Sequence, residues 1–346
     1  MELFPDLRDL PESDPISIYR YRDGLYAADL LSAAIVWLDF FSWLAVHPST
    51  KEAICAERGL VDRPVDVMLT LFAAMGLIES EQGVFHLTTL AKEHLVAGSP
   101  WFLGPYYGSL KERPVCKDML SVLQTGRTAN WGSLKTEKDW AKAMEDSVFA
   151  GQFTAAMDCR GVYLGQAVAK NVELKSFSRL LDIAGGSGIY ACSMVAHHPH
   201  LRASVFEKTP VDKVAAEAIA KRGFNDRVSV IAGNMFANPL PTGFDIHLIS
   251  NVLHDWDITL VMQILKSSFD ALMPGGLLII HDAHINREKT GPLPVAAYSA
   301  MLMHSTEGKC YSIAETESYL TNCGFHNFDF KDTAADRGII TARKPK

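Results

Sequence analysis

The second half of the chain alternates short apolar runs with helical segments, and this alternation limits the fold more than any other feature. From residue 179 onward, apolar runs of four or five residues are followed by segments with helical spacing, and Pro or Gly residues separate the units. Such alternation predicts a sheet with helices on both faces. We expect a doubly wound, mixed sheet of seven strands. The strands are expected at residues 179–183, 202–206, 228–231, 246–249, 277–280, 327–330 and 338–341.

The first half, from residue 16 to about 170, has mostly helical patterns, with one short β signal at 83–87. Ser49-Thr50 can cap a helix that runs through residues 52–55, and a second helix is expected over 64–75. Helix, turn, helix and hairpin in this order predict a winged helix. We therefore expect an α/β chain in which a mainly helical winged-helix domain precedes the sheet domain.

Charge argues against a nucleic-acid partner. The 346 residues carry a formal net charge of −7, and no basic stripe interrupts it. Such a chain repels phosphate backbones. The helix expected at residues 63–75 has Arg63 as its only base, with Asp62 and Asp66 close by. We expect no nucleic-acid partner, and a winged-helix DNA-binding regulator with a sensor domain is kept as a remote alternative.

The N-terminus has neither a basic start nor an apolar run before its prolines, which argues against a secretory signal. The most apolar segment, residues 30–46, is interrupted by Asp39 and is short for a membrane span. Six cysteines without a CxxC pair suit reduced thiols. We expect a cytoplasmic protein with no membrane partner.

A Gly-rich turn follows the first predicted strand, in the order Asp182-Ile183-Ala184-Gly185-Gly186-Ser187-Gly188. Glycines there let the backbone approach a ligand and point a helix N-terminus at it. The turn alone also fits a dinucleotide fingerprint, and Glu207 lies where a ribose partner is expected in either case. A tight βα turn without any ligand is the third interpretation.

Asp182 favours one of these ligands. A carboxylate at a strand end repels a pyrophosphate but attracts the ammonium and sulfonium groups of S-adenosylmethionine. We therefore expect S-adenosylmethionine as the cofactor, with Glu207 on the ribose hydroxyls and the third strand delivering residues to the adenine. The complete expected donor set is Asp182, Gly185, Gly186, Gly188, Glu207, Asn234, Met235 and Ser250.

His254 is the catalytic candidate. It lies just past the fourth strand, in Leu253-His254-Asp255-Trp256, where ligands bind in open α/β sheets. A neutral imidazole there can accept the proton of a hydroxyl as its oxygen attacks a methyl carbon. The alternative is a histidine in a helix-capping segment, with Asp255 or Asp257 serving the helix N-terminus.

Further polar residues follow the fifth strand. His281, Asp282 and His284, with His304 later in the chain, include the residue types of an open iron or zinc site. Their spacing does not decide whether they converge. We expect no metal, and His281, His284 and His304 are kept as weak candidate ligands.

Together these motifs resemble the hydroxyindole and caffeate type O-methyltransferases, including bacterial members that act on polyketides and phenazines. The resemblance covers nearly the whole chain, and the Leu-His-Asp-Trp sequence after a strand is its most specific part. The other matching segments are Phe85-His86-Leu87-Thr88, Pro100-Trp101-Phe102-Leu103-Gly104, residues 181–188, Gly233-Asn234-Met235-Phe236, Met273-Pro274-Gly275-Gly276 and Gly308-Lys309.

The resemblance implies a homodimer built through the N-terminal helices, with His254 as the base. It also implies a small-molecule acceptor, contacted by Phe153, Met157, His281, Met301 and His304. The implied division of the chain is a winged-helix dimerisation domain at 1–110, linking helices that contribute to the substrate pocket at 111–170, and the S-adenosylmethionine-binding domain at 171–346.

Three positions depart from the family pattern. Asn234 stands in place of an acidic residue, and His281 and Cys310 stand where plant members carry glutamates that flank the catalytic histidine. The most favoured reaction is methyl transfer to a hydroxyl of a small molecule. Methylation of carbon or sulfur on a small acid, or a donor-dependent reaction without methyl transfer, remain alternatives.

Overall fold

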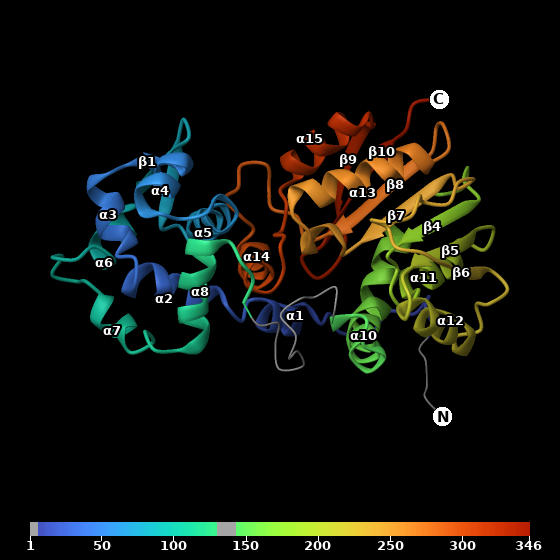
Figure 1. The fold of residues 1–346 in the computed structure, drawn as a ribbon, viewed down its shortest axis with the longest axis horizontal. Coiled ribbons are helices and arrows are strands. Elements are labelled where there is room, and N and C mark those ends of the chain that lie inside the picture. Colours follow the sequence, from blue (N-terminus) through green and yellow to red (C-terminus); the bar gives the residue numbers. More distant parts are fainter. Residues whose placement is uncertain (1–5, 130–142) are drawn as a thin grey trace. The chain divides into compact units, whose positions relative to one another are not determined.

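A computed structural model describes residues 6–129 and 143–346, and these form two compact units. The first unit holds the larger sheet and consists of Met1–Ile16, Leu134–His284 and Ile313–Lys346. The second holds most of the N-terminal helices and consists of Ser17–Ser133 and Ile285–Ser312. Figure 1 shows both units in ribbon form. The units are not simply consecutive, because the segment 285–312 belongs with the N-terminal helices.

The sheet unit contains seven strands in the order β6-β5-β4-β7-β8-β10-β9. The first five in this order are parallel neighbours, and β10 runs antiparallel to both β8 and β9. The predicted doubly wound, mixed, seven-stranded sheet is confirmed. The strands are β4 (Arg179–Ile183), β5 (Arg202–Glu207), β6 (Val228–Ala232), β7 (Ile246–Ser250), β8 (Leu277–Asp282), β9 (His326–Asp332) and β10 (Gly338–Arg343).

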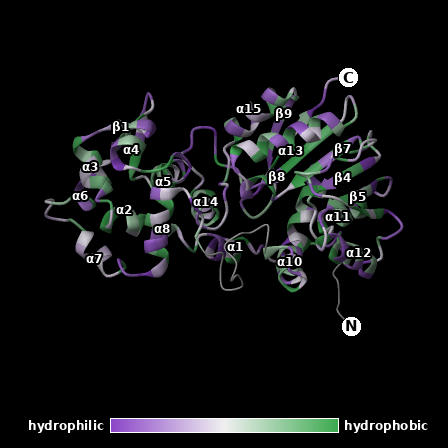
Figure 2. Ribbon diagram, viewed as in Figure 1, coloured by the Kyte–Doolittle hydropathy of each residue, from purple (hydrophilic) through white to green (hydrophobic). Residues whose placement is uncertain are grey.

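Helices cover both faces of this sheet. In Figure 1, α13 and α15 lie together on one side of it, and α10, α11 and α12 lie together on the other. The central strands are buried between them, and Figure 2 shows apolar residues concentrated in these strands. The helices are α10 (Ser147–Asn171), α11 (Ile189–His197), α12 (Val211–Lys221), α13 (Ile258–Ala271) and α15 (Ile313–Cys323), with a single 3₁₀ turn, η1 (Leu253–Asp255).

The second unit is mainly helical and contains a small antiparallel sheet in the order β1-β3-β2. Thr50 caps α4 by accepting a hydrogen bond from Ala53 N, as its position in the sequence predicts. The helices are α1 (Ile16–Asp23), α2 (Ala27–Val36), α3 (Phe40–Val46), α4 (Lys51–Arg58), α5 (Asp62–Ala74), α6 (Thr89–His94), α7 (Gly104–Gly108), α8 (Pro114–Thr125) and α14 (Leu293–Ser305). The strands are β1 (Ser49–Thr50), β2 (Ile78–Glu81) and β3 (Val84–Leu87).

Helix α5 is held against the segment 285–312 by polar contacts. Asp66 accepts hydrogen bonds from Lys289 Nζ at 2.9 Å and from Lys309 Nζ at 2.5 Å. The Arg63 guanidinium donates to the carbonyl oxygens of Gly308 at 2.8 Å and Gly126 at 2.9 Å. The charged residues that the sequence places on this helix therefore serve the packing of the unit itself.

Within the described ranges, no single helix is both long and apolar enough to cross a membrane. Helices α1 to α3 pass such a test only as a pair that is bent by 59°. Leu30, Phe40 and Phe41 from this stretch are at most 1 % exposed, so they belong to the core of the helical unit.

Candidate active site

The Gly-rich turn lies between β4 and α11, at the carboxyl end of the parallel strands. Ala184, Gly186 and Gly188 all have positive φ values, of 55°, 57° and 76°. A Cβ at Gly185 would stand 2.6 Å from the Asp182 carboxylate, so this position excludes any side chain. A Cβ at Gly186 would meet nothing within 4 Å. The turn is therefore closed toward the sheet and open on its other side, as a ligand-binding loop requires.

Two buried carboxylates flank this turn. Glu207, at the end of β5, accepts hydrogen bonds from Gly186 N at 3.1 Å and Lys208 N at 2.8 Å. Asp182 accepts one from Ala191 N at 3.2 Å, and its Oδ1 has no hydrogen-bond partner among the described residues. Burial raises the pKa of each carboxyl to about 7. Both groups are therefore suited to a ligand that brings positive charge and hydroxyl donors.

The loop after β6 carries the next two predicted residues, Asn234 and Met235. The Asn234 side chain accepts a hydrogen bond from Phe236 N at 2.9 Å, and its backbone N donates to Asn238 Oδ1 at 2.8 Å. Part of its amide therefore fixes the loop. Phe236 also packs edge-on against Trp256, with ring centroids 4.7 Å apart, which links this loop to the segment that follows β7.

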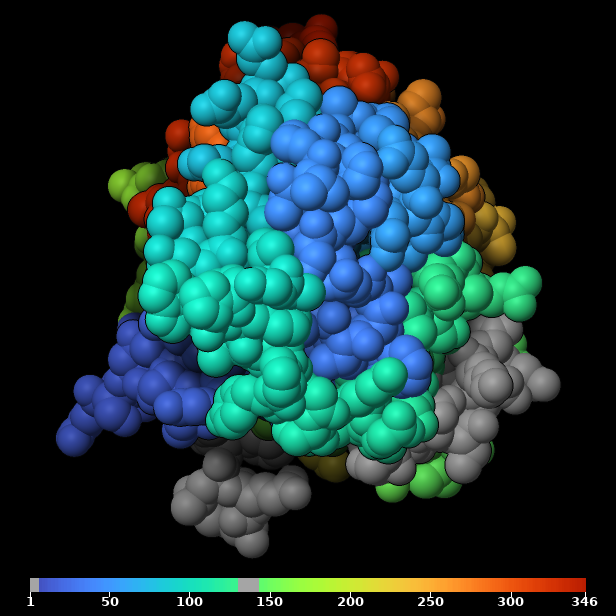
Figure 3. Space-filling model, turned by 90° about the vertical axis from the view of Figure 1, so that its left-hand side faces the viewer, coloured from blue at the N-terminus to red at the C-terminus, as the bar shows by residue number. Residues whose placement is uncertain are grey.

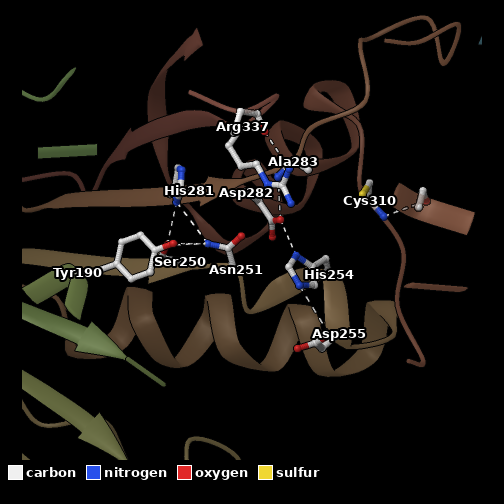
Figure 4. A network of polar contacts seen from close by, with 12 residues as sticks. Tyr190, Ser250, Asn251, His254, Asp255, His281, Asp282, Ala283, Cys310 and Arg337 are labelled. Carbon is white, nitrogen blue, oxygen red and sulfur yellow. Dashed lines mark hydrogen bonds and ion pairs between the residues drawn. The ribbon is translucent and has the colours of Figure 1, made fainter. Parts of the chain in front are cut away.

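His254 lies in η1, just beyond β7, and is 4 % exposed. Its Nδ1 is 2.5 Å from Asp282 Oδ1, and its Nε2 is 3.7 Å from Asp255 Oδ1 (Figure 4). Burial opposes the protonated imidazole, but the two carboxylates outweigh it and raise the pKa of His254. Burial likewise opposes ionisation of Asp282, yet His254 holds the pKa of that carboxyl at about 2. The two residues thus form a buried imidazole and carboxylate pair.

A second polar group fixes the chain just before His254. Asn251 has a positive φ of 53°, and its backbone N donates to His281 O at 2.8 Å. Its side chain donates to Tyr190 Oη at 3.0 Å and to Ser250 Oγ at 3.1 Å, and Ser250 Oγ is 2.8 Å from His281 Nδ1. Figure 4 shows this cluster beside the His254 pair. Burial lowers the pKa of His281 to about 3, so its ring is neutral.

Sequence reasoning missed the contact between Asp282 and His254. His281 was expected where plant members carry a glutamate beside the catalytic histidine, but the carboxylate that contacts His254 here belongs to the next residue, Asp282. The predicted strand ended at residue 280, whereas β8 continues to Asp282. Successive strand residues face opposite sides, so His281 turns to Ser250 and Asp282 to His254. The Asp in Ile280-His281-Asp282 was the available signal.

The expected acceptor residues divide between the two units. Phe153 and Met157 are half-buried on α10 and belong with the sheet unit, as does His281. Met301 and His304 lie on α14 in the helical unit, where the His304 ring packs near Tyr26 with centroids 4.7 Å apart.

The other residues singled out by the sequence are placed as follows. Cys310 is buried in the helical unit, and its backbone N donates to Ser299 Oγ. Within residues 6–129 and 143–346, no group of three or more His, Cys, Asp or Glu side chains is arranged to hold a metal. His281 and His284 lie in the sheet unit and His304 in the helical unit.

Comparison with known proteins agrees with this geometry. The family model described as an O-methyltransferase domain matches residues 121–326. The chain is 30% identical over 305 residues to a 3-hydroxy-5-methyl-1-naphthoate 3-O-methyltransferase of Streptomyces sahachiroi, covering 87% of this chain and 86% of that protein. It is 27% identical to an L-tyrosine C(3)-methyltransferase of Streptomyces lavendulae, covering 93% and 90%.

A solved structure is similar over nearly the whole length. It is an O-methyltransferase family 2 protein from Planctomyces limnophilus in complex with apigenin, with a TM-score of 0.88, 29% identity, and coverage of 98% of this chain and 99% of that one. The fold and the site define a small-molecule methyltransferase. The chain belongs to the O-methyltransferase family, and its methyl donor is S-adenosylmethionine.

The residues around the Gly-rich turn fit this donor. The open space at Gly186 leaves room for a ligand against the turn. Asp182 Oδ1, buried and without a hydrogen-bond partner among the described residues, has acceptor capacity for a cationic group. Glu207, held by two backbone N–H groups, keeps further lone pairs for hydroxyl donors.

Proposed function

We propose that the protein methylates a hydroxyl group of a small aromatic molecule and that His254 is its general base. The observation that carries this proposal is the buried pair of His254 Nδ1 and Asp282 Oδ1, 2.5 Å apart, at the carboxyl ends of β7 and β8. The named relatives support the acceptor class, because one is a naphthoate O-methyltransferase and another was solved with apigenin. Both of these molecules are aromatic hydroxy compounds.

The arrangement of the pair defines which nitrogen takes the proton. Asp282 accepts from Nδ1, so the neutral imidazole carries its proton on Nδ1 and its lone pair on Nε2. Bound S-adenosylmethionine supplies a methyl group already activated by a positively charged sulfur. On transfer the bond between sulfur and the methyl carbon would break, and sulfur would keep its electron pair as a neutral thioether. His254 Nε2 would take the proton of the acceptor hydroxyl, and Asp282 would stabilise the imidazolium that results.

We propose that the donor is held by the residues that surround the turn and the neighbouring strand ends. Asp182 faces the charged groups of the donor, Glu207 binds its ribose hydroxyls, and Asn234 with Met235 contacts its adenine. Gly185, Gly186 and Gly188 provide the close backbone approach, and Ser250 completes the set. We also propose that the acceptor is contacted by Phe153, Met157, His281, Met301 and His304.

We further propose that the chain forms a homodimer through its N-terminal helices, with residues 1–110 as a winged-helix dimerisation domain and 111–170 and 171–346 as the linking and donor-binding parts. Exposed aromatic side chains support this. Trp101 is 61% exposed and Tyr106 is 78% exposed. The part of the chain around residue 100, turquoise in Figure 3, lies on the face shown there. Exposed aromatic side chains are enriched at protein interfaces.

A nucleic-acid partner is not part of the proposal. Arg63, the only base of α5, donates to four carbonyl oxygens of its own unit, and the chain carries a net charge of −7. A protein of this kind is expected to act in the cytoplasm, without a membrane partner.

Light scattering of the purified protein tests the dimer, and a monomer at micromolar concentration would contradict it.

The decisive experiment on the reaction uses methyl-labelled donor and a panel of phenols, hydroxy-naphthoates, amino acids and thiols. We expect label in an oxygen-linked methyl group of an aromatic product, identified by mass and by the chemical shift of the methyl carbon. Replacing His254 by Ala is expected to lower kcat by about 10² to 10⁴. One relative is a tyrosine C-methyltransferase, so the product must be checked for a carbon-linked methyl group. Such a product would refute the oxygen assignment. A product without added mass would support a reaction that leaves the methyl in place.

A further inference from the structure

Three arginines stand side by side at the amino ends of neighbouring strands in the sheet unit. Arg179 begins β4 and pairs with Arg202, which begins β5. Arg227 directly precedes β6, whose first residue, Val228, pairs with Ala203 of β5. Arg202 and Arg227 therefore lie opposite each other on neighbouring strands. Neighbouring strands are about 4.8 Å apart, and like charges directly opposite each other destabilise a sheet. An anion between these groups would remove that repulsion.

A cavity lies where these strand ends meet. It has a volume of about 200 Å³ and is lined by all three arginines together with Ser204, Ser229, Asn225 and Asp226. With three guanidinium groups and one carboxylate, the lining carries a charge of +2, although the whole chain carries −7. The cavity therefore concentrates positive charge on an otherwise acidic protein.

The cavity also offers neutral hydrogen-bond donors. Ser204 Oγ and Ser229 Oγ are 2.8 Å apart, so one hydroxyl donates to the other. Two hydroxyls contain two hydrogens, and this bond uses one of them. The second hydrogen can be donated to a ligand in the cavity.

The arginines are held in place by contacts that use a small part of their donor capacity. Arg202 Nη1 donates to Asp226 O at 2.7 Å, and Arg227 Nη1 donates to Pro199 O at 3.0 Å. Arg179 lies over the Phe244 ring, 5.1 Å from its centroid. Each guanidinium has five N–H donors in a planar fork that matches phosphate oxygens. The side chains are thus ordered before any ligand arrives.

We propose that this cavity, the arginine cavity (Arg179, Arg202, Arg227), binds a small multivalent oxyanion of the phosphate or pyrophosphate type. The site is distinct from the donor site. Arg179 and Arg202 stand at the amino ends of β4 and β5, whereas the Gly-rich turn follows the carboxyl end of β4 and Glu207 is the last residue of β5. The proposal does not depend on the methyl acceptor or on the role of His254.

Isothermal titration of the full-length protein with pyrophosphate tests this site. Saturating S-adenosylhomocysteine keeps the donor site filled, and sodium chloride matches the ionic strength of every sample. We expect one pyrophosphate per chain, and Arg202→Gln is expected to weaken binding about tenfold or more. Lys175→Gln is the matched control, because Lys175 is exposed, lies outside the cavity and removes the same charge. It is expected to change the affinity less than about twofold.

Three results would overturn the proposal. One is the absence of pyrophosphate binding when the donor site is filled. Another is equal weakening by Arg202→Gln and Lys175→Gln, since this would mean attraction by net charge alone. Should Arg202→Gln lower the unfolding midpoint, Ser229→Ala replaces it, because Ser229 is exposed and loses only a hydroxyl. Unchanged affinity in Ser229→Ala together with a folded Arg179→Gln that binds normally would refute the site in the same way.

Discussion

The contact between Asp282 and His254 allows a quantitative test by the substitution Asp282→Asn. The change keeps the size of the side chain and removes the charge that lies 2.5 Å from Nδ1. A hydrogen bond to a charged group contributes about 1.5 to 3 kcal/mol, and one pKa unit corresponds to about 1.4 kcal/mol. The pKa of His254, raised above its ordinary value of 6.5 by its two carboxylates, should therefore fall by about one to two units.

The assay is kcat and kcat/KM against pH with a saturating donor. A general base must be neutral, so activity in the wild type should rise with pH through the raised pKa of His254. In Asp282→Asn the acid limb should move to lower pH, while the plateau should fall by about 10² because the imidazolium formed during transfer is less stabilised. Donor affinity, measured by titration, should change little. Asp255→Asn is the matched control. Asp255 Oδ1 is 3.7 Å from His254 Nε2, so this substitution should lower the pKa of His254 by less than Asp282→Asn does.

Two outcomes would refute the reasoning. If Asp282→Asn lowers kcat without moving the acid limb of the pH profile, this limb does not reflect the protonation of His254. If Asp282→Asn binds the donor normally and keeps the wild-type plateau, the carboxylate does not assist proton transfer. A loss of both donor binding and activity would instead indicate unfolding, which the thermal midpoint detects, and Asp282→Glu then tests whether a carboxylate alone restores the profile.

Three further outcomes follow from the geometry. Asp182 and Glu207 have pKa values near 7 in the folded protein and near 4 in unfolded chains, so the folded state binds more protons between these values. The donor-free protein should therefore become less stable as pH rises from about 4 to 7, and Glu207→Gln should flatten this dependence in thermal melts. Gly185→Ala should weaken donor binding at least about tenfold by titration, since its Cβ would meet Asp182 at 2.6 Å. Gly223→Ala, where an added Cβ would meet nothing within 4 Å, should leave the affinity unchanged. Arg63→Met should lower the free energy of unfolding by about 2 to 4 kcal/mol in urea melts, because it leaves carbonyl groups without their donor; a change below 1 kcal/mol would contradict this.

The sequence predicted the sheet because hydrophobic periodicity and punctuation by Pro and Gly are local signals. All seven strands were placed, and β4 was matched at both ends. Strand ends were less well predicted, since β7 and β8 run on into polar residues whose burial depends on neighbouring strands. Nothing local shows that the segment 285–312 packs with the N-terminal helices, because Lys289 and Lys309 meet Asp66 only in the folded chain.

The same limit explains why only one member of the proposed catalytic pair, His254, was predicted. The sequence placed His254 correctly after a strand. Its partner is 28 residues away, and which residue of β8 becomes the partner depends on the alternation of side chains along that strand. Because neighbouring strand residues face opposite sides, only one of His281 and Asp282 can face the imidazole. Once β8 extends to Asp282, its last two residues hold the catalytic turn at two points. The His281 carbonyl fixes Asn251 at the start of the turn, and the Asp282 carboxylate fixes the imidazole three residues later. The orientation of His254 thus depends on the end of one neighbouring strand, so shortening that strand should impair proton transfer before it impairs donor binding.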